Sequence, residues 1–161
     1  MKRFIPIVLV VAIAAAVLAL TSGGTSKAHK ATAVPASRAA ADSALDLRTT
    51  PLGKVLVDAN GRTLYLFEAD KPNMSNCSGA CLSLWPALLS HQKPEAGAGV
   101  LAAKIGTITA TGGKRQVTYD GHPLYYYAAD QKPGDTTGQG LKQFGAEWYV
   151  LAASGNKIDN G

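Results

Sequence analysis

The chain of 161 residues has a formal net charge of +5, and 47% of its residues are hydrophobic. Residues 47–161 hold 11 of the 16 Lys and Arg residues and 9 of the 11 Asp and Glu residues, so this part carries a balance of +2 and has the size of one domain. The sequence contains no arginine-rich stripe and no surface pattern that mixes basic and aromatic residues. It therefore argues against nucleic acid as a partner.

The first twenty residues have the form of a secretory signal peptide. Lys2 and Arg3 precede an uncharged apolar run that extends from Phe4 to Leu20. We expect residues 1–20 to be removed during export. The alternative is an uncleaved N-terminal anchor, because the 17 apolar residues reach the lower limit for a membrane-spanning helix. A membrane contact is expected only through such an anchor.

Residues 21–46 are rich in Ala, Ser, Thr and Gly and contain no aromatic residue. A segment of this composition cannot bury enough apolar surface to offset the entropy lost on ordering. The sequence thus predicts a flexible tether over residues 21–46, followed by a folded domain over residues 47–161.

Within this domain, the stretch LYLFEADKP that begins at Leu64 returns sixty residues later as LYYYAADQKP, beginning at Leu124. Each copy carries a tyrosine, a second aromatic residue two places on and an aspartate five places on. These motif residues are Tyr65, Phe67 and Asp70 in the first copy and Tyr125, Tyr127 and Asp130 in the second. The duplication predicts two tandem repeats, at about residues 52–90 and 105–152.

Strands dominate the predicted elements. Residues 54–58 and 63–67 are apolar or β-branched runs around Asn60-Gly61, and residues 115–119 and 123–127 repeat this arrangement around Asp120-Gly121. Such dipeptides form tight turns, so each pair is expected to be an antiparallel hairpin. Residues 105–110 and 148–152 are further strand candidates, and residues 79–89 are the helical one. We expect a mainly β fold, a small antiparallel sandwich or partly closed barrel with one short helical segment.

Alternation along a strand assigns the motif side chains to faces. Tyr65 and Phe67 share one face of their strand, whereas Leu64 and Leu66 share the other. Asp70 lies beyond the strand end, where its carboxylate can accept backbone N–H groups of the following turn. This spacing favours a structural role, in which the aromatic residues are buried anchors and the aspartate closes the turn.

Cys77 and Cys81 are the only cysteines, and an exported chain favours a disulfide between them. Its expected effect is local, fixing the turn that precedes Trp85. The alternative is a redox-active or copper-binding thiol pair. In that case Met74, Cys77, Cys81 and His91, with His122 in reserve, offer the soft and imidazole ligands that suit copper.

The paired YLFEAD and YYYAAD segments resemble the hallmark of a bacterial secreted-repeat family, described as predicted lipoproteins with a Yx(FWY)xxD motif. The cysteine pair followed by Trp85-Pro86, and PGDTTGQG followed later by EWYVL, add to the resemblance. It covers residues 52–153. It implies a location that is secreted or on the extracytoplasmic face of the bacterial cell envelope. The lipid-acceptor cysteine that follows a lipoprotein signal is missing from this chain.

We expect a non-enzymatic binding or structural module with no catalytic residues, metal or cofactor, and an unknown envelope component as its partner. No convergent catalytic group such as a Ser-His pair is evident. The alternative is a redox or copper-handling accessory protein in extracytoplasmic electron transfer. In that reading, Tyr65 and Tyr125 release protons to carboxylates as they lose electrons, and the neighbouring aromatic residues extend the path.

Overall fold

The structure is a computed structural model, and it describes residues 44–159. The predicted signal peptide and residues 21–43 of the predicted tether lie outside this part. The first strand, β1, spans Leu45–Thr50, and Leu45 is buried in the core. The expected boundary at residue 47 is therefore corrected, because Leu45 and Asp46 belong to the folded domain and not to the tether.

The described residues form eight short strands, one α-helix and two 3-10 turns. In chain order these are β1 (Leu45–Thr50), β2 (Gly53–Asp58), β3 (Tyr65–Phe67), α2 (Ala80–Leu84), η1 (Ala102–Lys104), β4 (Ile105–Thr109), η2 (Thr111–Gly113), β5 (Arg115–Tyr119), β6 (His122–Pro123), β7 (Lys142–Gln143) and β8 (Ala146–Val150).

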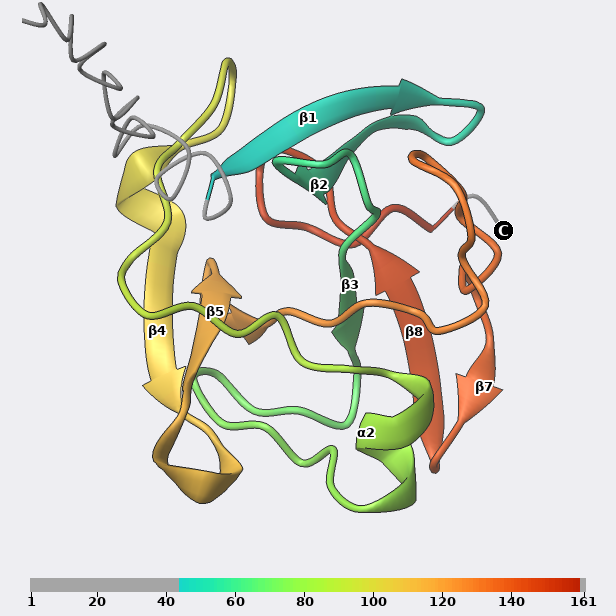
Figure 1. Cartoon of the computed structure of the whole chain (residues 1–161). Coiled ribbons are helices and arrows are strands. Elements are labelled where there is room, and N and C mark those ends of the chain that lie inside the picture. Colours follow the sequence, from blue (N-terminus) through green and yellow to red (C-terminus); the bar gives the residue numbers. More distant parts are fainter. Residues whose placement is uncertain (1–43, 160–161) are drawn as a thin grey trace, which may run out of the picture. The chain divides into compact units, whose positions relative to one another are not determined.

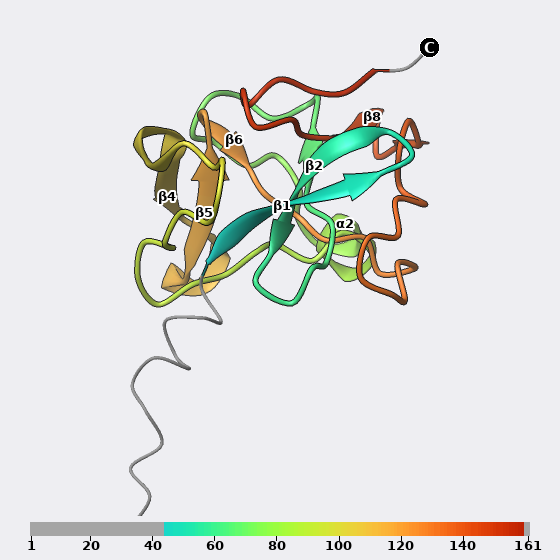
Figure 2. The same cartoon turned by 90° about the horizontal axis from the view of Figure 1, so that it is seen from above.

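The strands pair as three small antiparallel sheets, with the orders β1-β2, β3-β8-β7 and β4-β5-β6. In Figure 1 the β4-β5-β6 sheet and the β3-β8-β7 sheet stand side by side, with α2 below. In Figure 2, which views the domain from above, the β1-β2 hairpin lies between β4 and β5 on one side and β8 on the other. The mainly β, antiparallel fold with one short α-helix is confirmed, and the described strands form no closed barrel.

Both predicted hairpin turns are present, with different lengths. Asp120 and Gly121 both adopt positive φ, at 52° and 82°, as a two-residue hairpin turn requires. In the first repeat Ala59 lengthens the turn, and there Gly61 has positive φ, at 79°, while Asn60 does not. The Asp58 carboxylate accepts the backbone N–H groups of Asn60 and Arg62, and so fixes the longer turn.

Residues 64–67 lie between two hydrophobic cores, and their side chains alternate between the two sides as predicted. Leu64 and Leu66 lie in one core, whereas Tyr65 and Phe67 lie in the other. We call the first the leucine core; its buried members are Leu45, Leu56, Leu64, Leu66, Leu88, Val100, Ile105, Val117, Tyr119, Leu124, Tyr149 and Leu151. We call the second the aromatic core; its buried members are Val55, Val57, Tyr65, Phe67, Cys77, Cys81, Trp85, Tyr125, Trp148 and Val150.

Candidate functional site

The two motif tyrosines meet where the repeats join. The N–H of Tyr65 donates to the carbonyl oxygen of Tyr125 at 2.9 Å, and the N–H of Tyr125 donates back to Tyr65 at 3.0 Å. This reciprocal pair forms an antiparallel bridge between equivalent positions of the two repeats. An approximate two-fold axis of internal symmetry therefore passes through this bridge.

The motif side chains are exchanged across the same axis. The hydroxyl of Tyr65 donates to Asp130 Oδ2 at 2.7 Å, and the hydroxyl of Tyr125 donates to Asp70 Oδ2 at 2.7 Å. Each aspartate therefore serves the tyrosine of the other repeat. The spacing within each motif did not predict this pairing across the repeats.

The second carboxylate oxygen of each motif aspartate holds the turn that follows it. Asp70 Oδ1 accepts the backbone N–H of Asn76 at 2.6 Å, and Asp130 Oδ1 accepts that of Thr137 at 3.0 Å. These are the turn contacts that the spacing predicted. One carboxylate thus joins a local turn to a tyrosine in the other half of the domain.

Both motif tyrosines are fully buried. Burial is the main cause that raises the pKa of the Tyr65 hydroxyl far above its ordinary value, and the bond to Asp130 adds to it. Burial likewise raises the pKa of the Tyr125 hydroxyl, although a bond with Ser75 opposes this shift. Burial also raises the pKa of the Asp70 carboxyl, against the effect of its two donors. Both phenols therefore remain neutral hydrogen-bond donors near neutral pH.

Four aromatic rings form a continuous stacked column in the aromatic core. Ring centroids lie 4.1 Å apart between Phe67 and Trp148, 3.9 Å between Trp148 and Trp85, and 4.4 Å between Trp85 and Tyr127. The outer rings are thus the second motif aromatics, each stacked on the tryptophan of the other repeat. Tyr65 also makes an edge-to-face contact with Trp85 of its own repeat at 5.3 Å, and Tyr125 makes the equivalent contact with Trp148 at 5.2 Å.

A disulfide joins Cys77 and Cys81, whose Cα atoms lie 5.4 Å apart. Cys81 lies in the first turn of α2, and the backbone N–H of Trp85 donates to its carbonyl oxygen at the helix end. The disulfide therefore lies next to the short segment that carries Trp85 into the stacked column.

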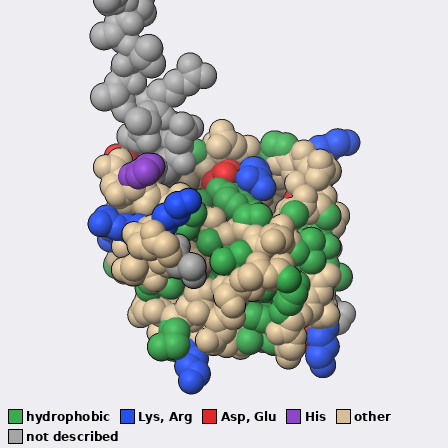
Figure 3. Space-filling model, turned by 60° about the horizontal axis from the view of Figure 1, so that its bottom comes forward, with side chains coloured by type: hydrophobic (Ala, Val, Ile, Leu, Met, Phe, Trp, Pro, Cys, Tyr) green, Lys and Arg blue, Asp and Glu red, His purple; other side chains and the backbone are tan. Residues whose placement is uncertain are grey.

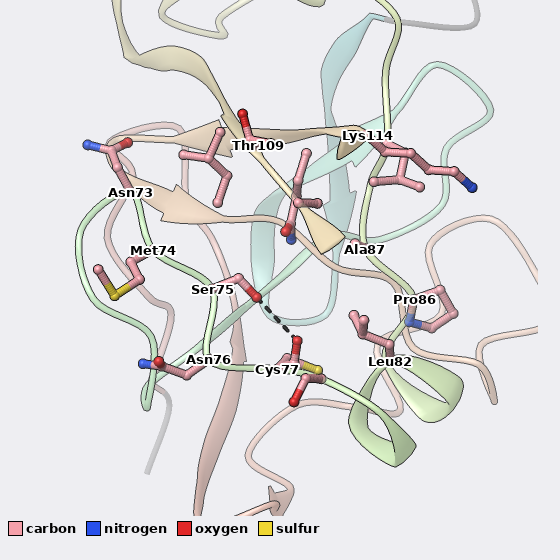
Figure 4. Close-up of a pocket in the computed structure, with 15 residues that line it drawn as sticks. Asn73, Met74, Ser75, Asn76, Cys77, Leu82, Pro86, Ala87, Thr109 and Lys114 are labelled. Atoms are coloured by element: carbon pink, nitrogen blue, oxygen red, sulfur yellow. Dashed lines mark hydrogen bonds between the residues drawn. The ribbon is translucent and has the colours of Figure 1, made fainter. Parts of the chain in front are cut away.

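One hollow in the described part of the molecule has a volume of about 740 Å³. Loop 73–78, the segment around α2 and the β4-β5 hairpin line it, on the side of the domain turned forward in Figure 3. Hydrophobic side chains form several patches on this face, and most Lys and Arg side chains lie toward its edges (Figure 3). In Figure 4, Met74 and Ser75 stand on one wall, Leu82 and Pro86 on another, and Thr109 and Lys114 along a third. We call this feature the main hollow.

The main hollow backs directly onto one motif pair. Ser75 and Gln116 both line it: Ser75 hydrogen-bonds with the hydroxyl of Tyr125, and Gln116 lowers the pKa of that hydroxyl. Asp130, from the other motif pair, lines a smaller hollow of about 260 Å³ with Tyr126 and Tyr127. Each Tyr–Asp pair therefore supports the wall of a surface depression.

A family model described as a secreted repeat of unknown function matches residues 47–89 and 106–152. The chain belongs to this family. The family resemblance found in the sequence is thus confirmed, as are the two tandem copies. No curated protein and no solved structure matches the chain significantly.

Membership of the secreted-repeat family agrees with the export that the sequence predicted, and the protein is extracytoplasmic. Among the residues that the structure describes, no helix is long and apolar enough to cross a membrane. The family description assigns no activity to the secreted repeats.

The alternative copper ligands are only partly brought together in the secreted repeats. Met74 is 54% exposed and lines the main hollow, as does Cys77, whereas His91 lines a neighbouring depression. Both cysteine sulfurs are engaged in the disulfide. Over residues 44–159, no group of three or more His, Cys, Asp and Glu side chains is placed to hold a metal ion.

Several polar residues that support the site were not among the site residues predicted from the sequence. Gln143 accepts the indole N–H of Trp85 on its side chain at 2.8 Å and that of Trp148 on its backbone oxygen at 3.3 Å. Ser75 and Gln116 flank Tyr125, and Thr137 flanks Asp130. Isolated serine, threonine and glutamine residues carry no sequence signal of this kind, because their partners are distant along the chain.

Proposed function

We propose that the protein is a non-enzymatic binding module of the cell envelope, in which the paired motifs build the scaffold and the main hollow binds the partner. The observation that carries this proposal is the hollow itself. Its lining includes Met74 and Leu89, which are 54% and 43% exposed and belong to the few large hydrophobic side chains on the described surface. Apolar side chains exposed together in a concave surface are typical of a binding site.

The state of the motif groups supports a non-enzymatic role. A catalytic acid, base or nucleophile must reach a substrate. Here the two tyrosine hydroxyls are buried and bound to aspartates, and each aspartate also holds a backbone N–H. The groups that recur in both repeats are thus engaged with one another, which favours a scaffold over a reaction centre.

Retention of the full exported chain on isolated cell-envelope fractions tests this role. Leu89→Asp introduces a charge into the main hollow, so we expect it to lower retention severalfold. Leu101→Asp is the matched control, because Leu101 is similarly exposed, at 48%, and does not line the hollow. Equal retention of both variants and the unchanged protein would remove the hollow from the proposal, provided that thermal unfolding shows all three to be folded.

A second candidate, a redox accessory protein, is favoured by the stacked column. Four rings in contact, with Tyr65 beside Trp85 and hydrogen-bonded to Asp130, offer a route for electrons and a proton acceptor for the phenol. Copper carried on Met74 and reduced cysteines is the related possibility. Purification under air, followed by elemental analysis, thiol titration and visible absorption, tests it. Bound copper or two free thiols would favour this candidate over the binding module.

A further inference from the structure

The outer edge of β4 has no strand beside it. β4 is the terminal strand of its sheet and pairs with β5 alone among the described strands. The backbone N–H of Asp120 donates to the carbonyl oxygen of Lys104 at 2.8 Å, and the N–H of Ala110 donates to the carbonyl oxygen of Lys114 at 2.7 Å. Residues with even numbers from 104 to 110 therefore turn their backbone groups toward β5. Thr107 and Thr109 consequently direct theirs outward, and no described residue outside the sheet bonds to them.

This edge lacks the features that normally prevent strand pairing. Natural edge strands are protected by charged residues, prolines or bulges. From Ile105 to Gly113 the chain has no charged residue and no proline, and β4 pairs with β5 in an unbroken register. Thr107 is half-buried and Thr109 is exposed. The edge is therefore free to receive another backbone.

The edge also borders the main hollow. Ile108, Thr109 and Ala110 line the hollow from β4, and Gln116 lies opposite Ile108 on β5. A strand placed beside β4 would share the faces of the sheet, so every second side chain would point to the side of Ile108 and the hollow. The outward-facing backbone N–H and C=O groups of β4 thus lie next to a pocket for side chains. Recognition of an extended peptide requires both features.

We propose that β4 binds an extended peptide segment of a partner as an added antiparallel strand, with alternate apolar side chains of the peptide entering the main hollow. The inference deepens the proposed binding function and rests on it. Lys114 is the only charged residue among the described residues that line the hollow, and no described group pairs with its ammonium. Charge complementarity therefore favours an acidic group on the peptide near Lys114.

A second copy of this chain fits the site less well. If two β4 strands paired about Thr107, each would offer mainly Gly106, Ile108 and Ala110 to the face that borders the hollow. Gly106 has no side chain and that of Ala110 is one methyl group, so they leave most of a volume of about 740 Å³ unfilled. A foreign peptide can supply larger side chains, so it is the occupant that the geometry favours.

The protein side of the test is Thr107→Pro in the full exported chain. Proline is tolerated on an edge strand where the N–H faces outward, so the fold should persist. The probe is a nonapeptide of alternating threonine and valine with a glutamate at each end. We expect Thr107→Pro to weaken its binding roughly tenfold. Thr107→Val, the matched control, keeps the N–H and the β-branched shape, and its affinity should stay within about twofold of the unchanged protein.

The peptide side of the test needs no protein variant, so it holds even if the proline variant unfolds. In an antiparallel addition, residues whose N–H groups face β4 have their side chains on the same sheet face as Thr107, away from the hollow. N-methylation of the peptide threonines should therefore abolish binding, whereas N-methylation of the valines should preserve it. Equal binding of both methylated peptides would overturn strand addition.

The experiment separates this inference from the function on which it rests. If Leu89→Asp lowers retention on the envelope fraction while Thr107→Pro does not, the hollow binds a partner but strand addition is wrong. If neither variant lowers retention, both proposals fail. A stable dimer that Thr107→Pro dissociates, without binding of the nonapeptide, would assign the edge to a second copy and overturn the foreign peptide.

Discussion

At the scale of single residues, the motif hydroxyls are buried donors whose acceptors lie in the other repeat. Tyr65 and Asp130 are 65 positions apart in the chain, and Tyr125 and Asp70 are 55 apart. When one partner of a buried hydrogen bond is removed, the remaining group is left unsatisfied. The free-energy cost of that unsatisfied group exceeds the net contribution of the bond to stability. The tyrosine hydroxyls should therefore contribute to stability out of proportion to their size.

Tyr65→Phe tests this contribution. The substitution removes the hydroxyl and leaves Asp130 with its Thr137 contacts alone. We expect the free energy of unfolding to fall by about 1–3 kcal/mol, because a charged acceptor loses a buried donor. Urea unfolding followed by tryptophan fluorescence measures the change. Tyr125→Phe should act similarly, since its contact with Asp70 is equivalent.

Tyr127→Phe is the control for the ring itself. Tyr127 stacks on Trp85, and no hydrogen bond of its hydroxyl occurs within residues 44–159. The equivalent residue in the first repeat is already a phenylalanine, Phe67. We expect a change of no more than about 0.5 kcal/mol. A loss of stability as large as that of Tyr65→Phe would contradict this prediction. It would show that any change to the stacked column is destabilising, so that the effect of Tyr65→Phe could not be assigned to the missing Tyr–Asp bond.

Asp70 gives a prediction on pH. Because burial raises its pKa in the folded state above the ordinary value of 3.8, the folded protein binds the proton more tightly than the unfolded chain does. Tighter proton binding by folded Asp70 adds to the free energy of unfolding. This contribution is complete below pH 3.8 and is lost as the pH rises through the folded-state pKa. The difference in stability between the unchanged protein and Asp70→Asn should therefore fall over this window. Urea midpoints across the acidic range measure it, and a difference that rises with pH would contradict the direction of the shift.

At the scale of elements, local patterns predicted the strands that carry their own periodicity. Alternation placed Tyr65 and Leu66 on opposite faces, and the Asp120-Gly121 pair predicted its hairpin. The exchange between repeats could not be predicted in this way, because periodicity describes a strand and its faces but not its distant neighbours. β3 accordingly pairs with β8, which is remote in the sequence, as well as folding back on β2 through Leu64 and Leu56.

Two strands had no sequence signal strong enough to be recognised. β1 reads LDLRTT, a mostly polar run next to the expected tether, and β7 has only two residues. β1 exists because Leu45 enters the leucine core and because the strand pairs with β2 along its whole length. The available sequence signal for this hairpin was its turn, which contains Pro51 and Gly53. Glycine suits the second position because its φ there is 109°.

The disulfide is expected to stabilise one element. α2 has five residues and no side-chain cap, so it depends on tertiary contacts. Joint substitution of Cys77 and Cys81 by alanine should lower the free energy of unfolding by about 2 kcal/mol, because the closed loop is short. Urea unfolding of the variant measures this loss, and the unchanged protein under reducing conditions should match it. Unfolding of the whole domain after reduction would show that the disulfide has more than this local effect.

At the scale of the whole domain, neither repeat contains all the partners of its own motif. Phe67 stacks on Trp148, Tyr127 stacks on Trp85, and each motif tyrosine bonds to the other repeat. The leucine core likewise joins Leu64 and Leu66 of the first repeat to Leu124 of the second. The duplication has therefore produced one cooperative folding unit and not two independently folded domains.

Separated halves test this cooperativity. A fragment of residues 44–104 ends before β4, and a fragment of residues 105–159 begins with it. We expect each to be unfolded alone, because a chain of about 60 residues buries little surface even when its core is complete. Mixing the halves should restore the near-ultraviolet circular dichroism of the stacked tryptophans, since the exchanged contacts then reform. A cooperative unfolding transition in either half alone would mean that one repeat is a self-sufficient domain, and that the exchange only joins two finished structures.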